Sequence, residues 1–133
     1  MAGYTKLNIK DDIEDQAPKF GFSPNLEFRL AGKPLEAEES AVSYLRVAPA
    51  FRVPFGHSHD KQEEIYVLVG GSARVKLDDE VVDLEPWDGL RIAKETVRNV
   101  EAGPDGAELL LFAAPRTEPG DANMQQGWWD DGP

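Results

Sequence analysis

A chain of 133 residues with 41% hydrophobic residues has the length and apolar content of one compact domain. Its net charge of -11 disfavours nucleic acids and anionic membrane surfaces as partners, because both repel an acidic protein. The absence of cysteine excludes disulfides, thiolate zinc sites and thiol nucleophiles, so any metal would need nitrogen and oxygen ligands. The chain shows no apolar signal core and no apolar run long enough for a membrane span, which predicts a soluble cytoplasmic protein.

Residues 1–26 are predicted to form an irregular arm, because they are polar, acidic and interrupted by turn-forming Pro and Gly. From residue 27 the pattern changes to short apolar or alternating runs separated by turns. These runs lie at 42–48, 64–69, 72–77, 81–84, 89–93, 97–101 and 108–113. Many short strands at this spacing are typical of an all-β sandwich or barrel, here expected over residues 27–115.

The clearest hairpin lies at residues 73–84, where apolar and polar residues alternate on both sides of an Asp-Asp turn. This alternation predicts a buried face and a solvent face. Ala73, Val75 and Leu77 are expected on one face, with Arg74 and Lys76 on the other. Beyond the barrel, residues 116–133 form a polar tail with Trp128 and Trp129, which are expected to anchor it on the barrel or on a partner subunit.

Both histidines lie just before an apolar run, in the sequence Gly56-His57-Ser58-His59. Side chains alternate along a strand, so His57 and His59 point to the same side and can converge on one ion. Glu63 keeps this parity if the loop 60–62 is regular, as do the apolar residues 65, 67 and 69. Gln62 and Glu64 flank Glu63 as alternative ligands, although solvated positions are expected for both.

His57-x-His59, three residues, Glu63, six residues and Gly70 resemble the first signature motif of the cupin superfamily, His-x-His-x(3,4)-Glu-x(6)-Gly. The resemblance extends over residues 42–113 and implies a single-domain jelly-roll β-barrel. It also implies that His57, His59 and Glu63 hold a divalent metal such as Zn, Ni, Mn or Fe inside the barrel. Cupins often form dimers, so a homodimer is a further expectation.

The second cupin motif, which normally supplies a fourth ligand, is not retained. Its five signature positions fall on Trp87, Ala93, Glu95, Arg98 and Ala102. This register places Arg98 where the family has a histidine, and a slip of one residue would place Asn99 there instead.

An inward Arg98 changes the expected chemistry, because a guanidinium group cannot ligate a cation but binds carboxylates well. Two outcomes stay open. Either a metal binds His57, His59 and Glu63 while Arg98 holds an anionic ligand, or Arg98 pairs with Glu63 and no metal binds. The first outcome predicts a small metalloenzyme acting on an acidic or hydroxylated molecule, and the second a non-catalytic small-molecule-binding protein.

Overall fold

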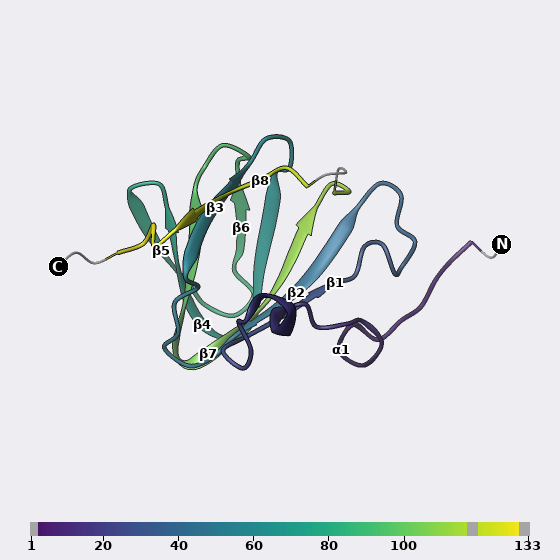
Figure 1. Ribbon diagram of the computed structural model, residues 1–133, viewed down its shortest axis with the longest axis horizontal. Helices are drawn as coiled ribbons and strands as arrows, with labels where there is room; N and C mark the ends of the chain where they lie inside the picture. Colours follow the sequence, from purple (N-terminus) through teal and green to yellow (C-terminus); the bar gives the residue numbers. More distant parts are fainter. Residues whose placement is uncertain (1–2, 117–119, 131–133) are drawn as a thin grey trace.

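The computed structural model describes residues 3–116 and 120–130, and its strands form one strongly curled antiparallel sheet (Figure 1). The strands are β1 (Leu26–Leu30), β2 (Ala41–Val47), β3 (Phe55–His59), β4 (Glu64–Leu77), β5 (Glu80–Leu84), β6 (Gly89–Ile92), β7 (Arg98–Ala113) and β8 (Ala122–Gln126). Two short helices, α1 (Ile9–Asp12) and η1 (Ala17–Phe20), precede them. Among these described residues, no helix has the length and hydropathy that crossing a membrane would require.

The two long strands, β4 and β7, pair with each other and hold the rest of the sheet together. Strand β7 also pairs with β2 and β3, while β4 also pairs with β5 and β6. Strands β1 and β8 complete the order β1-β2-β7-β3-β8. The all-β prediction is therefore confirmed. The sequence pattern split β4 and β7 into two strands each and missed β1 and β8, whereas the alternation expected at His57 and His59 corresponds to β3.

The sequence pattern predicted breaks in β4 and β7 where the two strands bend together. We call this bend the glycine corner, because it is formed by Gly70 and Gly71 on β4 and Gly106 on β7. The pairing of β4 with β7 shifts register on both sides of Gly70 and Gly71. Gly71 has φ +73°, and a Cβ at this position would lie 2.0 Å from the carbonyl oxygen of Gly106. Because Gly106 also has positive φ, both strands change direction here at positions that favour glycine.

The bend reverses the inward parity of β4. Tyr66 and Leu68 are buried before the corner, and Ala73 and Val75 are buried after it. In the hairpin that follows, Ala73 pairs with Leu84 and Val75 with Val82, while Arg74 is exposed. The predicted hairpin faces are thus confirmed, but the face predicted for residues 65, 67 and 69 is wrong, since Ile65 is 42% exposed.

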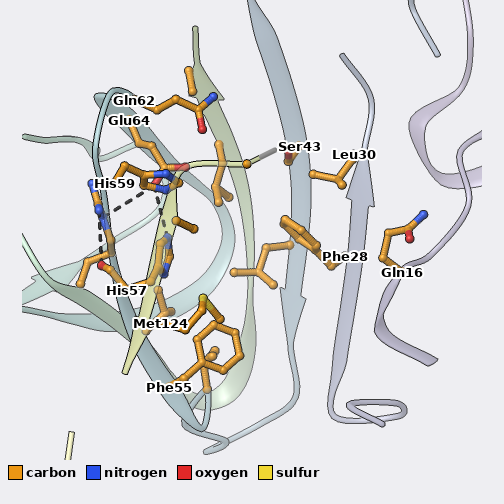
Figure 2. Close-up of a pocket in the computed structure, with 18 of the residues that line it drawn as sticks. Gln16, Phe28, Leu30, Ser43, Phe55, His57, His59, Gln62, Glu64 and Met124 are labelled. Carbon is orange, nitrogen blue, oxygen red and sulfur yellow. Dashed lines mark hydrogen bonds and ion pairs between the residues drawn. The ribbon is translucent and has the colours of Figure 1, made fainter. Parts of the chain in front are cut away.

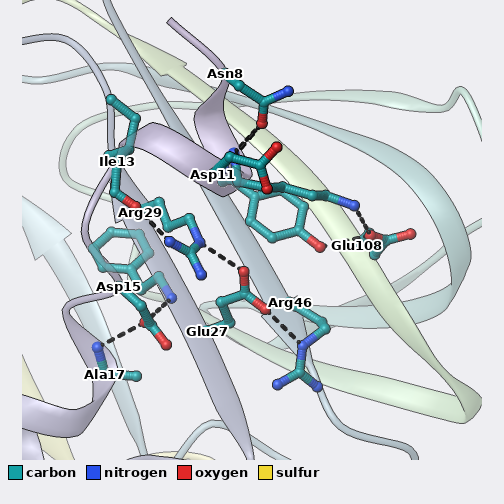
Figure 3. A network of polar contacts seen from close by, with 12 residues as sticks. Asn8, Asp11, Ile13, Asp15, Ala17, Glu27, Arg29, Arg46 and Glu108 are labelled. Carbon is teal, nitrogen blue, oxygen red and sulfur yellow. Dashed lines mark hydrogen bonds and ion pairs between the residues drawn. The ribbon is translucent and has the colours of Figure 1, made fainter. Parts of the chain in front are cut away.

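The N-terminal arm is fixed to the edge of the sheet by polar contacts (Figure 3). Asp15 accepts hydrogen bonds from the backbone amides of Ala17 and Phe28, at 3.0 and 2.9 Å. Arg29 donates to the carbonyl oxygen of Ile13 and forms an ion pair with Glu27. These contacts place η1 and the residues after it beside β1, at one side of the cavity described below.

The C-terminal segment joins the sheet as β8, which pairs with β3 over five residues. Beyond β8, Trp129 is buried, and the guanidinium group of Arg52 lies 4.3 Å from its ring centroid. Trp128 packs on β3, where a Cβ at Gly56 would come within 2.7 Å of the indole ring. The strand that carries both histidines is therefore covered by the segment that sequence analysis treated as a tail.

Candidate metal centre

Three side chains from two strands converge at one end of the sheet interior (Figure 2). His57 and His59 come from β3, and Glu64 is the first residue of β4. Each offers one ligand atom, and these atoms all lie within 4.8 Å of one another. Two imidazole nitrogens and one carboxylate oxygen form a donor set that suits Zn²⁺ and other divalent transition metals.

Glu63, which the sequence pattern placed in this cluster, points outward instead. Its carboxylate is exposed and forms an ion pair with Arg91 on β6, with an N–O distance of 3.3 Å. Glu64 is buried and takes the inward position, in register with Tyr66 and Leu68. The prediction of Glu63 failed because the parity of His57 and His59 was carried forward through residues 60–63, which lie between β3 and β4 and do not keep strand alternation.

A signal for Glu64 was present in the motif itself. The motif allows four residues between the second histidine and the glutamate, and this spacing leads from His59 to Glu64. Six residues further on, the motif glycine then falls on Gly71. Gly71 is the position where positive φ and close approach to Gly106 exclude a side chain, so backbone geometry supports this spacing.

The distances within the cluster fit a single bound ion. The Oε1 atom of Glu64 lies 3.2 Å from Nε2 of His59 and 3.5 Å from Nε2 of His57. Ligand atoms that share one ion at about 2.1 Å are separated by about 3 to 3.5 Å, depending on the coordination geometry. The two contacts of Glu64 with the histidines therefore have the spacing of ligands to one ion, and the two histidine nitrogens lie within 4.8 Å of each other.

Asp121 orients His59 and was not identified from the sequence. Its Oδ1 atom lies 2.9 Å from Nδ1 of His59, and its Oδ2 accepts from the backbone amides of Lys61 and Gln62. An ionised carboxylate can only accept, so in the neutral imidazole Nδ1 of His59 carries the proton and Nε2 keeps its lone pair. Asp121 lies sixty-two positions after His59, just before the unpredicted strand β8, and has no local motif.

Electrostatic contacts stabilise the charged forms of this cluster. Burial alone would raise the pKa of Glu64, but contacts with His57 and His59 lower that pKa to about 2. Burial alone would lower the pKa of His59, but Glu64 and Asp121 raise it above its ordinary value. Without an ion, the site therefore favours a carboxylate beside a protonated imidazole.

Arg98, the first residue of β7, occupies the corner where a fourth ligand was expected. Its side chain is fully buried, and it donates to the backbone carbonyls of His57 and Ala93 at 3.3 and 3.2 Å. Its Nε lies 3.6 Å from Oε1 of Glu64. The amide of neighbouring Asn99 donates to the carbonyl of Val53 instead. The alternative pairing of Arg98 with Glu63 is wrong, since Glu64 is the carboxylate beside Arg98.

Two buried nitrogens of the cluster lack hydrogen-bond partners among the described residues. These are Nε2 of His59, whose contact with Glu64 has poor hydrogen-bond geometry, and Nε of Arg98. The first offers a lone pair to a cation, and the second offers an N–H to an anion. Leaving such groups unpaired in a protein interior is costly. The residues present therefore fit a divalent metal together with an anionic ligand.

The cluster opens into a cavity of about 560 Å³, a volume within the range of small-molecule sites. Figure 2 shows the cavity extending from the histidines toward Phe28 and Leu30 on β1 and Gln16 on the arm. The described lining residues include two carboxylates, Glu64 and Asp121, and two guanidinium groups, Arg98 and Arg116. A bound divalent ion would leave the lining with excess positive charge, which an anionic ligand would neutralise.

Comparison with solved structures shows which known proteins share this fold. The sequence matches no protein-family model and no curated protein. Among solved structures, KdgF from Halomonas sp. superposes with a TM-score of 0.68 at 17% identity, covering 89% of this chain and 98% of that one. A cupin protein from Bacteroides fragilis gives 0.66 at 22% identity, covering 100% of this chain and 92% of the other.

A variant of oxalate decarboxylase from Bacillus subtilis gives a TM-score of 0.75 at 21% identity. The match covers 95% of this chain but only 33% of the decarboxylase, so this chain spans about one third of that protein. With these likenesses and the curled antiparallel sheet, the chain has the jelly-roll fold of the cupin superfamily. The fold predicted from the first motif is confirmed.

Proposed function

We propose that this protein is a metal-binding cupin in which His57, His59 and Glu64 hold a divalent ion and Arg98 binds an anionic ligand. The observation that supports the proposal most directly is the buried Nε2 of His59, which has no well-formed hydrogen bond among the described residues and has the other two donor atoms within 4.8 Å. A centre with three protein ligands leaves coordination positions free for a small molecule. The Halomonas and Bacillus proteins named above share only the fold, at 17% and 21% identity, so they assign no substrate.

The divalent ion would act as a Lewis acid on an oxygen atom of the bound ligand. The residues of this chain orient that ligand. Arg98 offers its Nε–H next to the centre, and its fixed contacts with the carbonyls of His57 and Ala93 hold the guanidinium group in place. Small carboxylates and hydroxy acids provide the matching oxygen atoms, since a guanidinium group binds a carboxylate with directional hydrogen bonds.

The neighbouring glutamates provide a matched test of the metal site. We expect Glu64→Gln to weaken Zn²⁺ binding at least about tenfold in calorimetric titration, because it removes the only anionic ligand. Glu63→Gln removes the same charge from an exposed position and should leave Zn²⁺ affinity within about twofold of wild type. Equal losses in both variants, or no Zn²⁺ binding by wild type, would contradict the proposal.

The anion site is tested by Arg98→Gln on the Zn²⁺-loaded protein. We expect acetate to bind about tenfold more weakly to this variant, because the charged donor beside the centre is lost. The metal-free alternative has its own support, since Nε of Arg98 is 3.6 Å from Glu64 and compensates its charge. In that case Zn²⁺ would not bind, and acetate affinity would be the same with and without Zn²⁺.

A further inference from the structure

The side chains that line the cavity indicate which class of ligand it binds, which the metal centre alone does not. Five aromatic rings follow one another along it, from the exposed Phe20 to the histidines. Ring centroids are separated by 6.4 Å for Phe20 and Phe22, and by 5.6 Å for Phe22 and Phe55. The series continues with 6.4 Å from Phe55 to His57 and 5.0 Å from His57 to His59. All five residues line the cavity.

This aromatic wall combines two separate parts of the chain. Phe20 and Phe22 belong to the N-terminal arm, whereas Phe55 belongs to β3. The arm is held at this position by the contacts of Asp15 and Arg29 with β1 and by the backbone bond from Phe22 to Ala17. The sequence resemblance to cupins begins only at residue 42. Phe20 and Phe22 therefore lie outside the segment that resembles the family.

Most other residues that line the cavity are also apolar. Figure 2 shows Phe28 and Leu30 of β1 on the side of the cavity opposite the histidines, and Met124 of β8 beside Phe55. The polar side chains labelled beside the histidines are Gln62 and Glu64, while Ser43 and Gln16 are labelled further away. The lining also includes Asn99 and Arg116. A ligand with many hydroxyl groups would leave most of them without partners in this cavity, at a cost for each.

We propose that the ligand is an aromatic acid, with its carboxylate at the metal centre and Arg98 and its ring system along Phe22 and Phe55. Aromatic rings pack favourably in offset or edge-to-face contact at centroid separations of about 4.5 to 7 Å, the spacing already found within the wall. The placement of the carboxylate rests on the proposed function. The placement of the ring system rests on the apolar walls alone.

Carboxylates of equal charge test this proposal on the Zn²⁺-loaded protein. In calorimetric titrations we expect 2-naphthoate to bind at least about tenfold more tightly than acetate, because its ring system leaves water for an apolar wall. Gluconate, a polar acid of similar length, should bind no better than acetate. Benzoate should bind more tightly than cyclohexanecarboxylate, which has the same head and number of ring carbons but no π system.

Variants locate the binding wall. Phe55→Leu and Phe22→Leu should each weaken 2-naphthoate binding about threefold or more, while acetate and Zn²⁺ affinities stay unchanged. Using two positions guards against a folding defect at either one. The control is Phe112→Leu, since Phe112 is 39% exposed and is not among the residues lining the cavity.

The outcomes separate this inference from the proposed function. Equal affinity for 2-naphthoate and acetate, tightest binding of gluconate, or a loss confined to Phe112→Leu would overturn the aromatic ligand. Tight 2-naphthoate binding that depends on Phe55 in a protein that binds no Zn²⁺ would support the aromatic ligand and refute the metal centre.

Discussion

Asp121 determines which nitrogen of His59 is available to an ion. One oxygen of its carboxylate accepts a hydrogen bond from Nδ1–H of His59, and its second oxygen accepts from the backbone amides of Lys61 and Gln62. Outer contacts of this kind orient metal-binding imidazoles and select the tautomer. The structure thus assigns Asp121 a positioning role for a residue that binds metal, rather than a direct role as ligand.

Asp121→Asn tests this role. The amide oxygen would accept from Lys61 and Gln62, so the amide nitrogen would face Nδ1 of His59 and donate to it. The imidazole proton would then move to Nε2 and block the lone pair. We expect Zn²⁺ affinity to fall about 10- to 100-fold, and ¹⁵N chemical shifts at alkaline pH to show the changed tautomer.

The control for this variant is Asp60→Asn. Asp60 is exposed and accepts a hydrogen bond from Asn123 at 2.9 Å, within the same two segments of chain. The Asp60→Asn substitution should leave both the His59 tautomer and the Zn²⁺ affinity unchanged. An Asp121→Asn protein with the wild-type tautomer and wild-type affinity would show that Asp121 serves only the loop backbone.

Sequence reasoning identified the site as far as local pattern extends. The paired histidines were found because they lie two positions apart on one strand, and Arg98 was found from the spacing of the second motif. Glu63 was chosen over Glu64 because strand parity was extended from His59 through the loop 60–62, which is not part of a strand. Asp121 was missed because its contact with His59 arises from tertiary pairing of β3 and β8.

At the scale of elements, the glycine corner sets the direction of the inward side chains on β4. Glu64, Tyr66 and Leu68 face inward on one side of the corner, and Ala73 and Val75 on the other. The sequence Gly70-Gly71 could be read as a turn, but not as a bend inside a continuous strand, because partner strand β7 must bend at the same place. The two strands predicted at 64–69 and 72–77 are consequently one strand, β4, in the structure.

Gly71→Ala should therefore be strongly destabilising. The new methyl group would meet the carbonyl oxygen of Gly106 at 2.0 Å, and positive φ adds strain. We expect the free energy of unfolding to fall by about 2 to 4 kcal/mol in urea denaturation. Gly89→Ala, on β6, is the control, since nothing lies within 4 Å of its added methyl group. Similar losses in both variants would show that the corner tolerates a side chain.

At the scale of the whole molecule, the cluster links stability to pH in a way that depends on metal. The pKa of His59 is raised in the folded protein, so its contribution is present below its ordinary value of 6.5 and is lost as pH rises. The pKa of Glu64 is lowered to about 2, so its contribution is present above 4.5 and is lost as pH falls. The metal-free cluster therefore stabilises the folded protein most between pH 4.5 and pH 6.5.

Denaturation of the metal-free protein should show its free energy of unfolding falling as pH rises above 6.5. Saturating Zn²⁺ should abolish this slope, because metal binding requires neutral imidazoles and the folded protein then no longer holds a proton on His59 that the unfolded chain has lost. The Glu64→Gln protein serves as the control and should show a weaker slope without metal, since only Asp121 still raises the pKa of His59, and a smaller response to Zn²⁺. Parallel pH profiles with and without Zn²⁺ would contradict the assignment of His59 as a ligand.

The pairing of β3 also bears on the order of events during folding. The histidine strand pairs with β7 through His57 and Arg98 alone, but with β8 over five residues, from Phe55 with Gln126 to His59 with Ala122. These partners are more than sixty residues apart, and closing so long a loop is slow compared with forming the local β4–β5 hairpin. An intermediate with the β4–β7 sheet already formed would still lack the ordered histidines. Metal capture is therefore expected to follow sheet formation and cannot nucleate it.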